Sequence, residues 1–120
     1  MKIASVSENQ SIEKRIAITP EIAKKYISFG FEVFLSKNYG AHLGIADEEY
    51  QNVGVKTLND EKEILNDANI VVQMGLPSDD KCSLLKQDQT LIGVLNPYSN
   101  KNKLSNLIKK KINIFSLELL

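Results

Sequence analysis

The sequence has few of the residues that usually mark a catalytic or metal-binding site. It contains no tryptophan, one cysteine (Cys82) and one histidine (His42) among 120 residues. A single cysteine excludes an internal disulfide, and one cysteine with one histidine forms no cluster of metal ligands at a recognisable spacing. We therefore expect no metal site, and the cysteine usage fits a reducing, cytoplasmic compartment.

Strong net charge and long apolar runs are also lacking. The 15 basic and 15 acidic side chains give a formal net charge of zero, so electrostatics offers no argument for a nucleic-acid partner. No apolar run approaches the ~20 residues needed to cross a bilayer, and the first residues show no secretory signal pattern. The composition predicts an ordinary globular domain.

Apolar runs alternate with helical patterns along the whole chain, and this alternation predicts the fold. Parallel strands need crossover connections, which helices usually supply. The pattern therefore predicts an α/β domain with a doubly wound, mainly parallel sheet and helices on both faces, flavodoxin-like or Rossmann-like. Strands are expected at 2–6, 31–35, 70–74, 90–95 and 112–117, with a possible edge strand at 55–58. Helices are expected at 20–29, at 47–53, to about 66 after a capping Asn59, after Ser78 and Asp79 with Leu84 and Leu85, and around 104–108.

A corner between the first strand and the first helix carries an isolated cation. Arg15 precedes an apolar triplet, and Thr19-Pro20 then forms a helix start, because the threonine hydroxyl can cap an early N–H and proline lacks one. Arg15 could offer a planar two-point grip to a carboxylate or phosphate. It could equally tie the corner to a neighbouring glutamate, and the residues leave both roles open.

In an open parallel sheet, ligands collect beyond the carboxyl ends of the strands. The residues expected there, which with Arg15 could line a cleft, are Ser7 and Glu8, 36–39, 75–77 and 96–98. They contain no nucleophile paired with a base. The segment 40–44 has two glycines but lacks the G-x-G-x-x-G order of dinucleotide sites, so it predicts turns, with His42 in a loop. Cys82 is expected to pack. The residues themselves therefore indicate no catalytic and no cofactor-binding group.

Several motifs resemble the N-terminal domain shared by alanine dehydrogenase and the alpha subunit of proton-translocating NAD(P) transhydrogenase. The opening motif is E-x-R-x-A-x-T-P at 13–20, followed by a helix and Gly-Phe-Glu-Val at 30–33. The resemblance continues through Tyr-Gly-Ala at 39–41, Asp-Glu-Glu-Tyr at 47–50 and the strand at 67–72. It covers essentially the whole chain.

Polar positions favour the transhydrogenase branch. In alanine dehydrogenases, the arginine equivalent to Arg15 and a lysine grip the pyruvate carboxylate, and a histidine does the acid–base work. This sequence has Gly75 at the lysine position and Asn96 at the histidine position, and neutral asparagine cannot shuttle a proton. The stretches 77–85, 95–97 and 115–119 are similar to transhydrogenases, although Gln73 stands where the family commonly has lysine. Saccharopine dehydrogenase is a third relative that matches less well at Asp79-Asp80.

The resemblance implies an N-terminal subdomain, residues 1–120, of a longer chain whose NAD(H)-binding Rossmann domain lies beyond residue 120. Hydride would pass from NAD(H) to NADP(H) on another component while protons cross the inner membrane, to which the subunit is peripheral. Partners would be the NAD(H)-binding domain, the NADP(H)-binding and membrane components, and a second copy in a homodimer. We expect no tight NAD(H) binding by residues 1–120 alone, and a cleft lined by Arg15, Gly75 and Asn96.

Two alternatives remain open on the sequence. One is a divergent alanine or saccharopine dehydrogenase-type enzyme in which Arg15 holds a carboxylate. The other is a non-enzymatic interaction module that pairs through its last strand and Leu119-Leu120.

Overall fold

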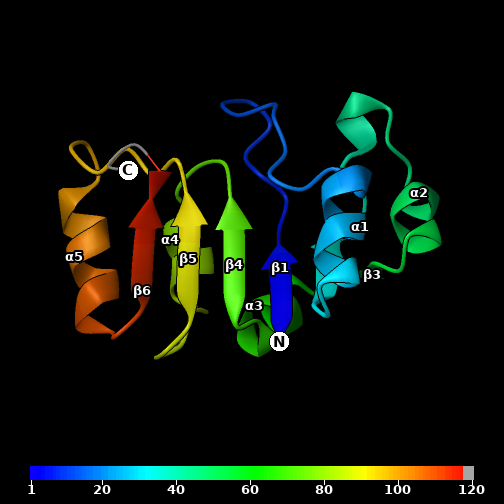
Figure 1. Ribbon diagram of the computed structural model, residues 1–120. Helices are drawn as coiled ribbons and strands as arrows, with labels where there is room; N and C mark the ends of the chain where they lie inside the picture. The colour runs from blue at the N-terminus through cyan, green and yellow to red at the C-terminus, as the bar shows by residue number, and fades with distance from the viewer. Residues whose placement is uncertain (118–120) are drawn as a thin grey trace.

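The computed structural model, which describes residues 1–117, contains one six-stranded sheet in which every neighbouring pair of strands is parallel. The strand order is β3-β2-β1-β4-β5-β6, so the chain winds outward from the middle in both directions (Figure 1). This confirms the predicted doubly wound α/β fold. The strands are β1 (Lys2–Ser5), β2 (Glu32–Ser36), β3 (Lys56–Leu58), β4 (Ile70–Gln73), β5 (Thr90–Gly93) and β6 (Asn113–Ser116).

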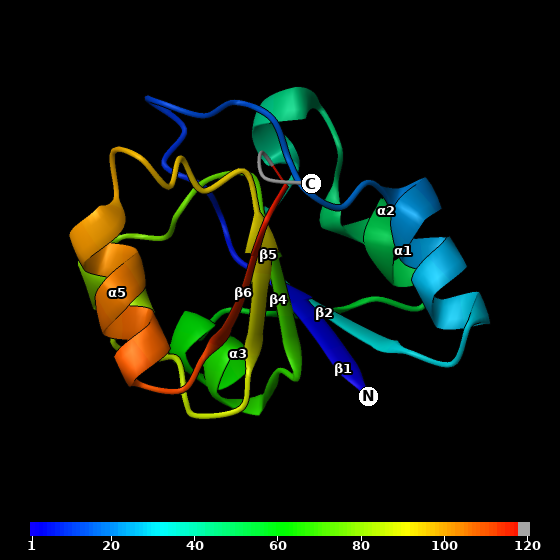
Figure 2. The ribbon, with the colours of Figure 1, turned by 60° about the vertical axis from the view of Figure 1, so that its left-hand side comes forward.

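Helices lie on both faces of the sheet (Figure 2). One face carries α1 (Pro20–Ser28) and α2 (Asp47–Asn52), and the other carries α3 (Glu61–Asp67), α4 (Asp79–Cys82) and α5 (Lys101–Lys109). A short 3-10 helix, η1 (Ala41–Leu43), fills the turn predicted between the two glycines. Within residues 1–117, none of the helices has the length and apolar content needed to cross a membrane.

The predicted start and stop signals of α1 are confirmed. Thr19 caps the helix by accepting a hydrogen bond from the Ile22 N–H at 3.3 Å, and Pro20 occupies the first turn. Gly30 follows the helix with a φ of +95°, a left-handed conformation that favours glycine. The capped end fixes the direction in which the corner containing Arg15 enters the helix.

Two predicted details are wrong. The α3 helix is capped by Asp60 instead of Asn59, because the Asp60 carboxylate reaches the Lys62 N–H at 3.0 Å. The α4 helix ends at Cys82, so Leu84 and Leu85 follow it and pack from the connecting segment. A single helical turn needs little sequence support, and its apolar neighbours misled the periodicity. Leu119 and Leu120 lie outside the described residues.

The sheet separates two apolar cores. On the face of α3, α4 and α5, the side chains of Ala4, Val71 and Leu91 are fully buried. On the face of α1 and α2, Val33 and Leu35 pack against Ile18, Tyr39 and Tyr50. Successive residues of a strand point to opposite faces, so each central strand contributes to both cores.

We predict that neighbouring substitutions in β5 differ in cost because their side chains point to opposite faces. Leu91→Ala should lower the free energy of unfolding by about 2–5 kcal/mol, since it opens a cavity in a closed core. Ile92→Ala, at a half-buried position, should cost only about 1 kcal/mol, because no closed cavity forms. Urea denaturation of both variants measures the difference. Equal losses would show that both faces of β5 are equally buried.

Candidate functional site

The hydroxyl of Tyr39 ties three segments together where the first strands end. Its oxygen accepts hydrogen bonds from the backbone N–H groups of Ala17 (3.1 Å) and Ile18 (3.2 Å), and it lies 2.8 Å from the Ser5 hydroxyl. Tyr50 packs edge-on against the Tyr39 ring, with centroids 5.9 Å apart, and donates its own hydroxyl to the Ile18 carbonyl at 2.8 Å. The two tyrosines therefore fix the connector between β1 and α1.

The direction of the bond between Ser5 and Tyr39 follows from the neighbouring acceptors. The Ser5 hydroxyl faces the Val72 carbonyl at 2.5 Å and the Gln73 Oε1 at 3.0 Å, and neither atom can donate. The single Ser5 proton must point to them, so Tyr39 donates to Ser5. Burial raises the pKa of the Tyr39 hydroxyl, which keeps that donor proton in place at neutral pH.

The side chain of Gln73 continues the pairing of β1 with β4 beyond its last backbone partners. Its Oε1 accepts the Val6 N–H at 2.8 Å, and its Nε2 donates to the Val6 carbonyl at 3.0 Å. The amide thus satisfies both backbone groups of one buried residue. A lysine here would have no acceptor for the Val6 N–H, so the departure from the family's usual residue changes how this end of the sheet is held.

Glu8 closes the same end of the sheet. One carboxylate oxygen accepts from the Gln73 Nε2 at 2.6 Å and the Met74 N–H at 3.0 Å, and the other accepts from the Gly75 N–H at 3.1 Å. Burial raises the pKa of the Glu8 carboxyl, and the two backbone donors and the Lys81 charge only partly oppose this rise. Among the described residues, the ion pairs do not include Glu8.

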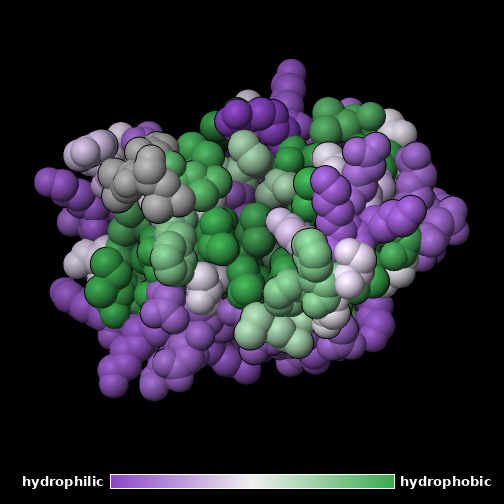
Figure 3. All heavy atoms as spheres, viewed as in Figure 1, coloured by the Kyte–Doolittle hydropathy of each residue, from purple (hydrophilic) through white to green (hydrophobic). Residues whose placement is uncertain are grey.

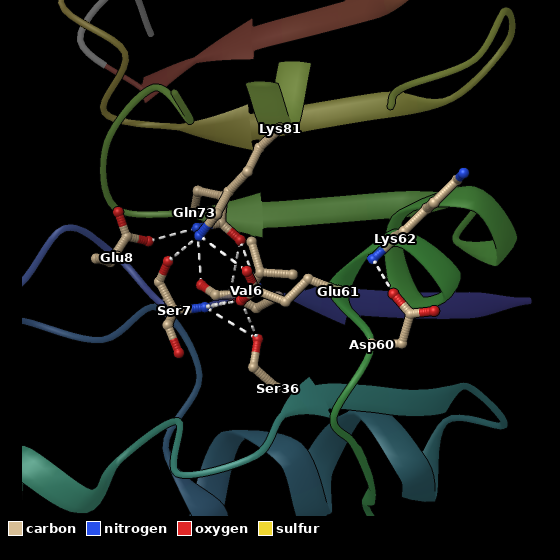
Figure 4. Close-up of polar contacts among 10 residues, drawn as sticks. Val6, Ser7, Glu8, Ser36, Asp60, Glu61, Lys62, Gln73 and Lys81 are labelled. Carbon is tan, nitrogen blue, oxygen red and sulfur yellow. Dashed lines mark hydrogen bonds and ion pairs between the residues drawn. The ribbon is translucent and has the colours of Figure 1, made fainter. Parts of the chain in front are cut away.

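A second polar cluster adjoins Glu8 and joins four elements (Figure 4). Glu61, in the first turn of α3, accepts from the Ser36 hydroxyl at 2.7 Å and from the Ser7 N–H at 3.2 Å. Lys81 of α4 lies 3.2 Å from the Glu61 carboxylate and donates to the Ser7 carbonyl at 2.8 Å. Ser7, which follows β1 and Val6, is thereby held from both sides by opposite charges.

The three predicted cleft residues come together around one cavity. Arg15, Gly75 and Asn96 all line a hollow of about 340 Å³, together with Glu8, Glu13 and residues of the segments after β1, β4 and β5. A smaller hollow of about 140 Å³ lies on the other side of Glu8 and includes Ser7, Gln73 and Lys81. The cavity is therefore at the carboxyl edge of the sheet, where the topology leads one to look for a ligand.

Within this cavity Arg15 grips a neighbouring side chain. Its Nε lies 2.6 Å from one Glu13 carboxylate oxygen, and its Nη2 lies 3.1 Å from the other. The contact lowers the pKa of the Glu13 carboxyl. The Arg15 side chain is 69% exposed, so this pair is screened by water and adds little stability. A ligand carboxylate would have to compete with Glu13 for the same two-point grip, and ligand binding by Arg15 stays a prediction.

Other candidate groups have structural surroundings. His42 lies in an exposed loop with its Nε2 2.8 Å from the Lys14 carbonyl. Cys82 packs against the core beside α3 and α5, and burial raises the pKa of its thiol. Within residues 1–117, no group of three or more acidic, histidine or cysteine side chains could hold a metal ion. The site is polar and ordered, and its resources are hydrogen bonds and one partly buried carboxyl group.

Sequence reasoning reached part of this arrangement. It placed Ser7, Glu8, Ser36 and Tyr39 at the carboxyl edge, but it gave no role to Gln73, Glu61 and Lys81. The signal for Gln73 was an amide that ends an otherwise apolar strand, which is where a buried polar group must find partners.

Comparisons with known proteins agree on one family. The chain matches the family model described as alanine dehydrogenase/PNT, N-terminal domain, over residues 5–120. It is 38% identical over 122 residues to the first part of NAD(P) transhydrogenase subunit alpha of Rickettsia prowazekii, which covers 98% of this chain and 32% of that protein. It is 30% identical over 112 residues to alanine dehydrogenase of Methanococcus maripaludis, which covers 93% of this chain and 30% of that protein.

A solved structure agrees at the level of the fold. Transhydrogenase from Sinorhizobium meliloti superposes with a TM-score of 0.93 at 24% sequence identity, covering 100% of this chain and 36% of that one. The chain therefore spans about a third of the length of the relatives that it matches.

We predict that Tyr39→Phe loosens the corner that carries Arg15. Loss of the hydroxyl leaves the Ala17 and Ile18 N–H groups without their acceptor and should lower the free energy of unfolding by about 1–3 kcal/mol. Tyr98→Phe, at a side chain that is 80% exposed, is the matched control and should change little. Chemical denaturation measures both, and amide exchange at Ala17 and Ile18 should accelerate in Tyr39→Phe alone.

We predict that Glu8 makes stability fall as pH rises. Its folded pKa is raised, so the folded state binds more protons than the unfolded state between the unfolded and folded pKa values. The stability of the protein relative to Glu8→Gln should therefore be greatest below the ordinary glutamate pKa and decrease as pH rises through the folded pKa. Denaturation of both proteins from pH 4 to pH 8 tests this. The exposed Glu63→Gln should show no such trend, and a trend of opposite sign for Glu8→Gln would contradict the burial argument.

Proposed function

Because the chain belongs to the family of alanine dehydrogenase/PNT N-terminal domains, we propose that it forms the first domain of the NAD(H)-binding alpha subunit of an NAD(P) transhydrogenase. Homology to the N-terminal part of such a subunit extends over 98% of the chain, at a higher identity than that to the alanine dehydrogenase. In this role the domain is one wall of a cleft, and NAD(H) is held by a second domain. Hydride transfer to NADP(H), coupled to proton translocation, is then a property of the whole assembly.

The observation that carries the proposal is the chemistry of the cavity beside Arg15. Gly75 and Asn96 line it where alanine dehydrogenases place a lysine and a histidine. A lysine ammonium polarises the keto group of pyruvate, and a histidine transfers the proton that the reaction requires. The Gly75 position contributes only a backbone N–H, which Glu8 accepts. This cavity therefore suits a supporting wall better than a site for reductive amination.

The proposed partners follow from this role. The NAD(H)-binding domain would face the carboxyl edge of the sheet, where Arg15 and the hydrogen-bonded segments after β1 and β4 are held in place. The NADP(H)-binding and membrane components would meet the assembled subunit at the cytoplasmic side of the inner membrane. The subunit itself would be a homodimer.

A second candidate is a divergent amino-acid dehydrogenase. It is favoured by one observation, which is that Arg15 lines a cavity shared with Glu8, a carboxyl group whose raised pKa suits proton transfer. Pyruvate-dependent NADH oxidation by the whole protein would support it. A non-enzymatic interaction module would show neither activity.

A chimera tests the proposed function. Residues 1–120 would replace the matching first third of the Rickettsia prowazekii subunit, and a control chimera would carry the matching part of the Methanococcus maripaludis alanine dehydrogenase. We expect the first chimera to bind NADH within about threefold of the parent subunit by isothermal titration. It should also sustain transhydrogenation with the partner subunits, whereas the control should not.

The isolated chain supplies the complementary measurement. Residues 1–120 alone should show no micromolar NADH binding, because the cofactor site belongs to another domain in this proposal. Tight binding by the isolated chain, or pyruvate reduction by the chimera, would contradict the proposed function.

A further inference from the structure

Half of one sheet face has no helix over it. On the side of α1 and α2, these helices stand over β1, β2 and β3, and β4, β5 and β6 lie beside them without cover (Figure 1). The in-register pairs bring Val72, Ile92 and Phe115 into one row across this half of the face. We call these side chains and their neighbours the open half-face: Ile70, Val72, Thr90, Ile92, Val94, Asn113, Phe115 and Leu117.

Burial alternates along these strands in a way that isolates the open half-face. Val71, Leu91 and Leu95, which point to the helices α3, α4 and α5, have no exposed area. Each member of the open half-face is half-buried or exposed, and Phe115 and Leu117 reach 51% and 48% exposure. The same strands are therefore sealed on one side and accessible on the other.

The open half-face is apolar and carries no charge. Six of its eight side chains are aliphatic or aromatic, and the other two are threonine and asparagine. Figure 3 shows hydrophobic atoms gathered at the centre of this face, with hydrophilic side chains toward the rim. Contiguous apolar patches of this kind mark interaction sites, and parallel sheets are normally covered on both faces. An uncharged surface excludes nucleic acid and strongly charged peptides as natural occupants.

The dimensions fit a helix. Neighbouring strands lie ~4.8 Å apart, so the three strands β4, β5 and β6 present a strip about 10 Å wide between the outer two. A helix with its side chains is about 10–12 Å across. The strip is bounded by α1 on one side and by the sheet edge at β6 on the other, and layered α/β folds cover such strips with helices that run along the strands.

We propose that the open half-face is the docking surface for an amphipathic helix from the rest of a transhydrogenase alpha-type polypeptide. This inference rests on the proposed function. The relative from Rickettsia prowazekii has about two thirds of its length outside the region that this chain matches, which provides such a helix. The occupant would present an apolar face to Val72, Ile92 and Phe115 and would complete the helical layer that α1 and α2 begin.

Cysteine labelling tests the inference in the chimera described above. Cys82→Ser removes the native thiol, and Phe115→Cys then reports on the open half-face. Phe29→Cys is the matched control, because Phe29 is another exposed phenylalanine, at 77%, and lies at the end of α1. Each variant is made in residues 1–120 and in the chimera, and a small maleimide is the probe.

We expect maleimide to modify Phe115→Cys at least about tenfold more slowly in the chimera than in residues 1–120, because a docked helix must open before the thiol reacts. Phe29→Cys should change by less than about twofold. Equal rates for Phe115→Cys in both proteins would overturn the inference. Protection in residues 1–120 themselves, with a dimer seen by sedimentation equilibrium, would also overturn it by identifying a second copy as the occupant.

NADH titration of the same chimera separates the two proposals. A chimera that binds NADH but leaves Phe115→Cys fully reactive would remove the docking surface and keep the proposed function. A chimera that protects Phe115→Cys without binding NADH would keep the docking surface and remove the proposed function.

Discussion

The Tyr39 hydroxyl is the contact on which the arrangement of the carboxyl edge depends. It donates to Ser5 in β1, accepts from two consecutive N–H groups in the connector before α1, and is buried against Tyr50. Buried backbone donors must be satisfied, and here a single oxygen satisfies two of them. The connector that carries Arg15 is thereby attached to the centre of the sheet instead of following its own local preference.

From this corner the polar groups form a continuous set. Ser5 leads to Gln73, Gln73 to Val6 and Glu8, and Glu8 to the backbone after β4. Glu61 and Lys81 hold the next residue from two helices. Such a network is rigid because nearly every donor has a defined acceptor. It leaves the cavity beside Arg15 with fixed walls and few groups able to move a proton, which is the character expected of a supporting domain.

The two faces of the sheet differ in how complete they are. The face under α3, α4 and α5 is closed, whereas the face under α1 and α2 is closed only over β1, β2 and β3. The polar network and the open half-face thus occupy different regions of the molecule, one at the carboxyl edge and the other over β4, β5 and β6. A domain with both features has a preformed cleft wall and an apolar surface available for the remaining polypeptide.

The sequence by itself determined the order of strands and helices, the cap at Thr19 and the stop at Gly30, because these depend on residues within a few positions of one another. Its motifs also identified the family and placed Arg15, Gly75 and Asn96 near one cleft. Only the tertiary structure decided that Asp60 caps α3, that Arg15 grips Glu13, and that Gln73 replaces a missing rung between β1 and β4. The contact between Ser5 and Tyr39 joins residues 34 positions apart, and that between Val6 and Gln73 joins residues 67 apart. Such pairs are set by how strands are ordered and registered in the sheet, which no local pattern of residues contains.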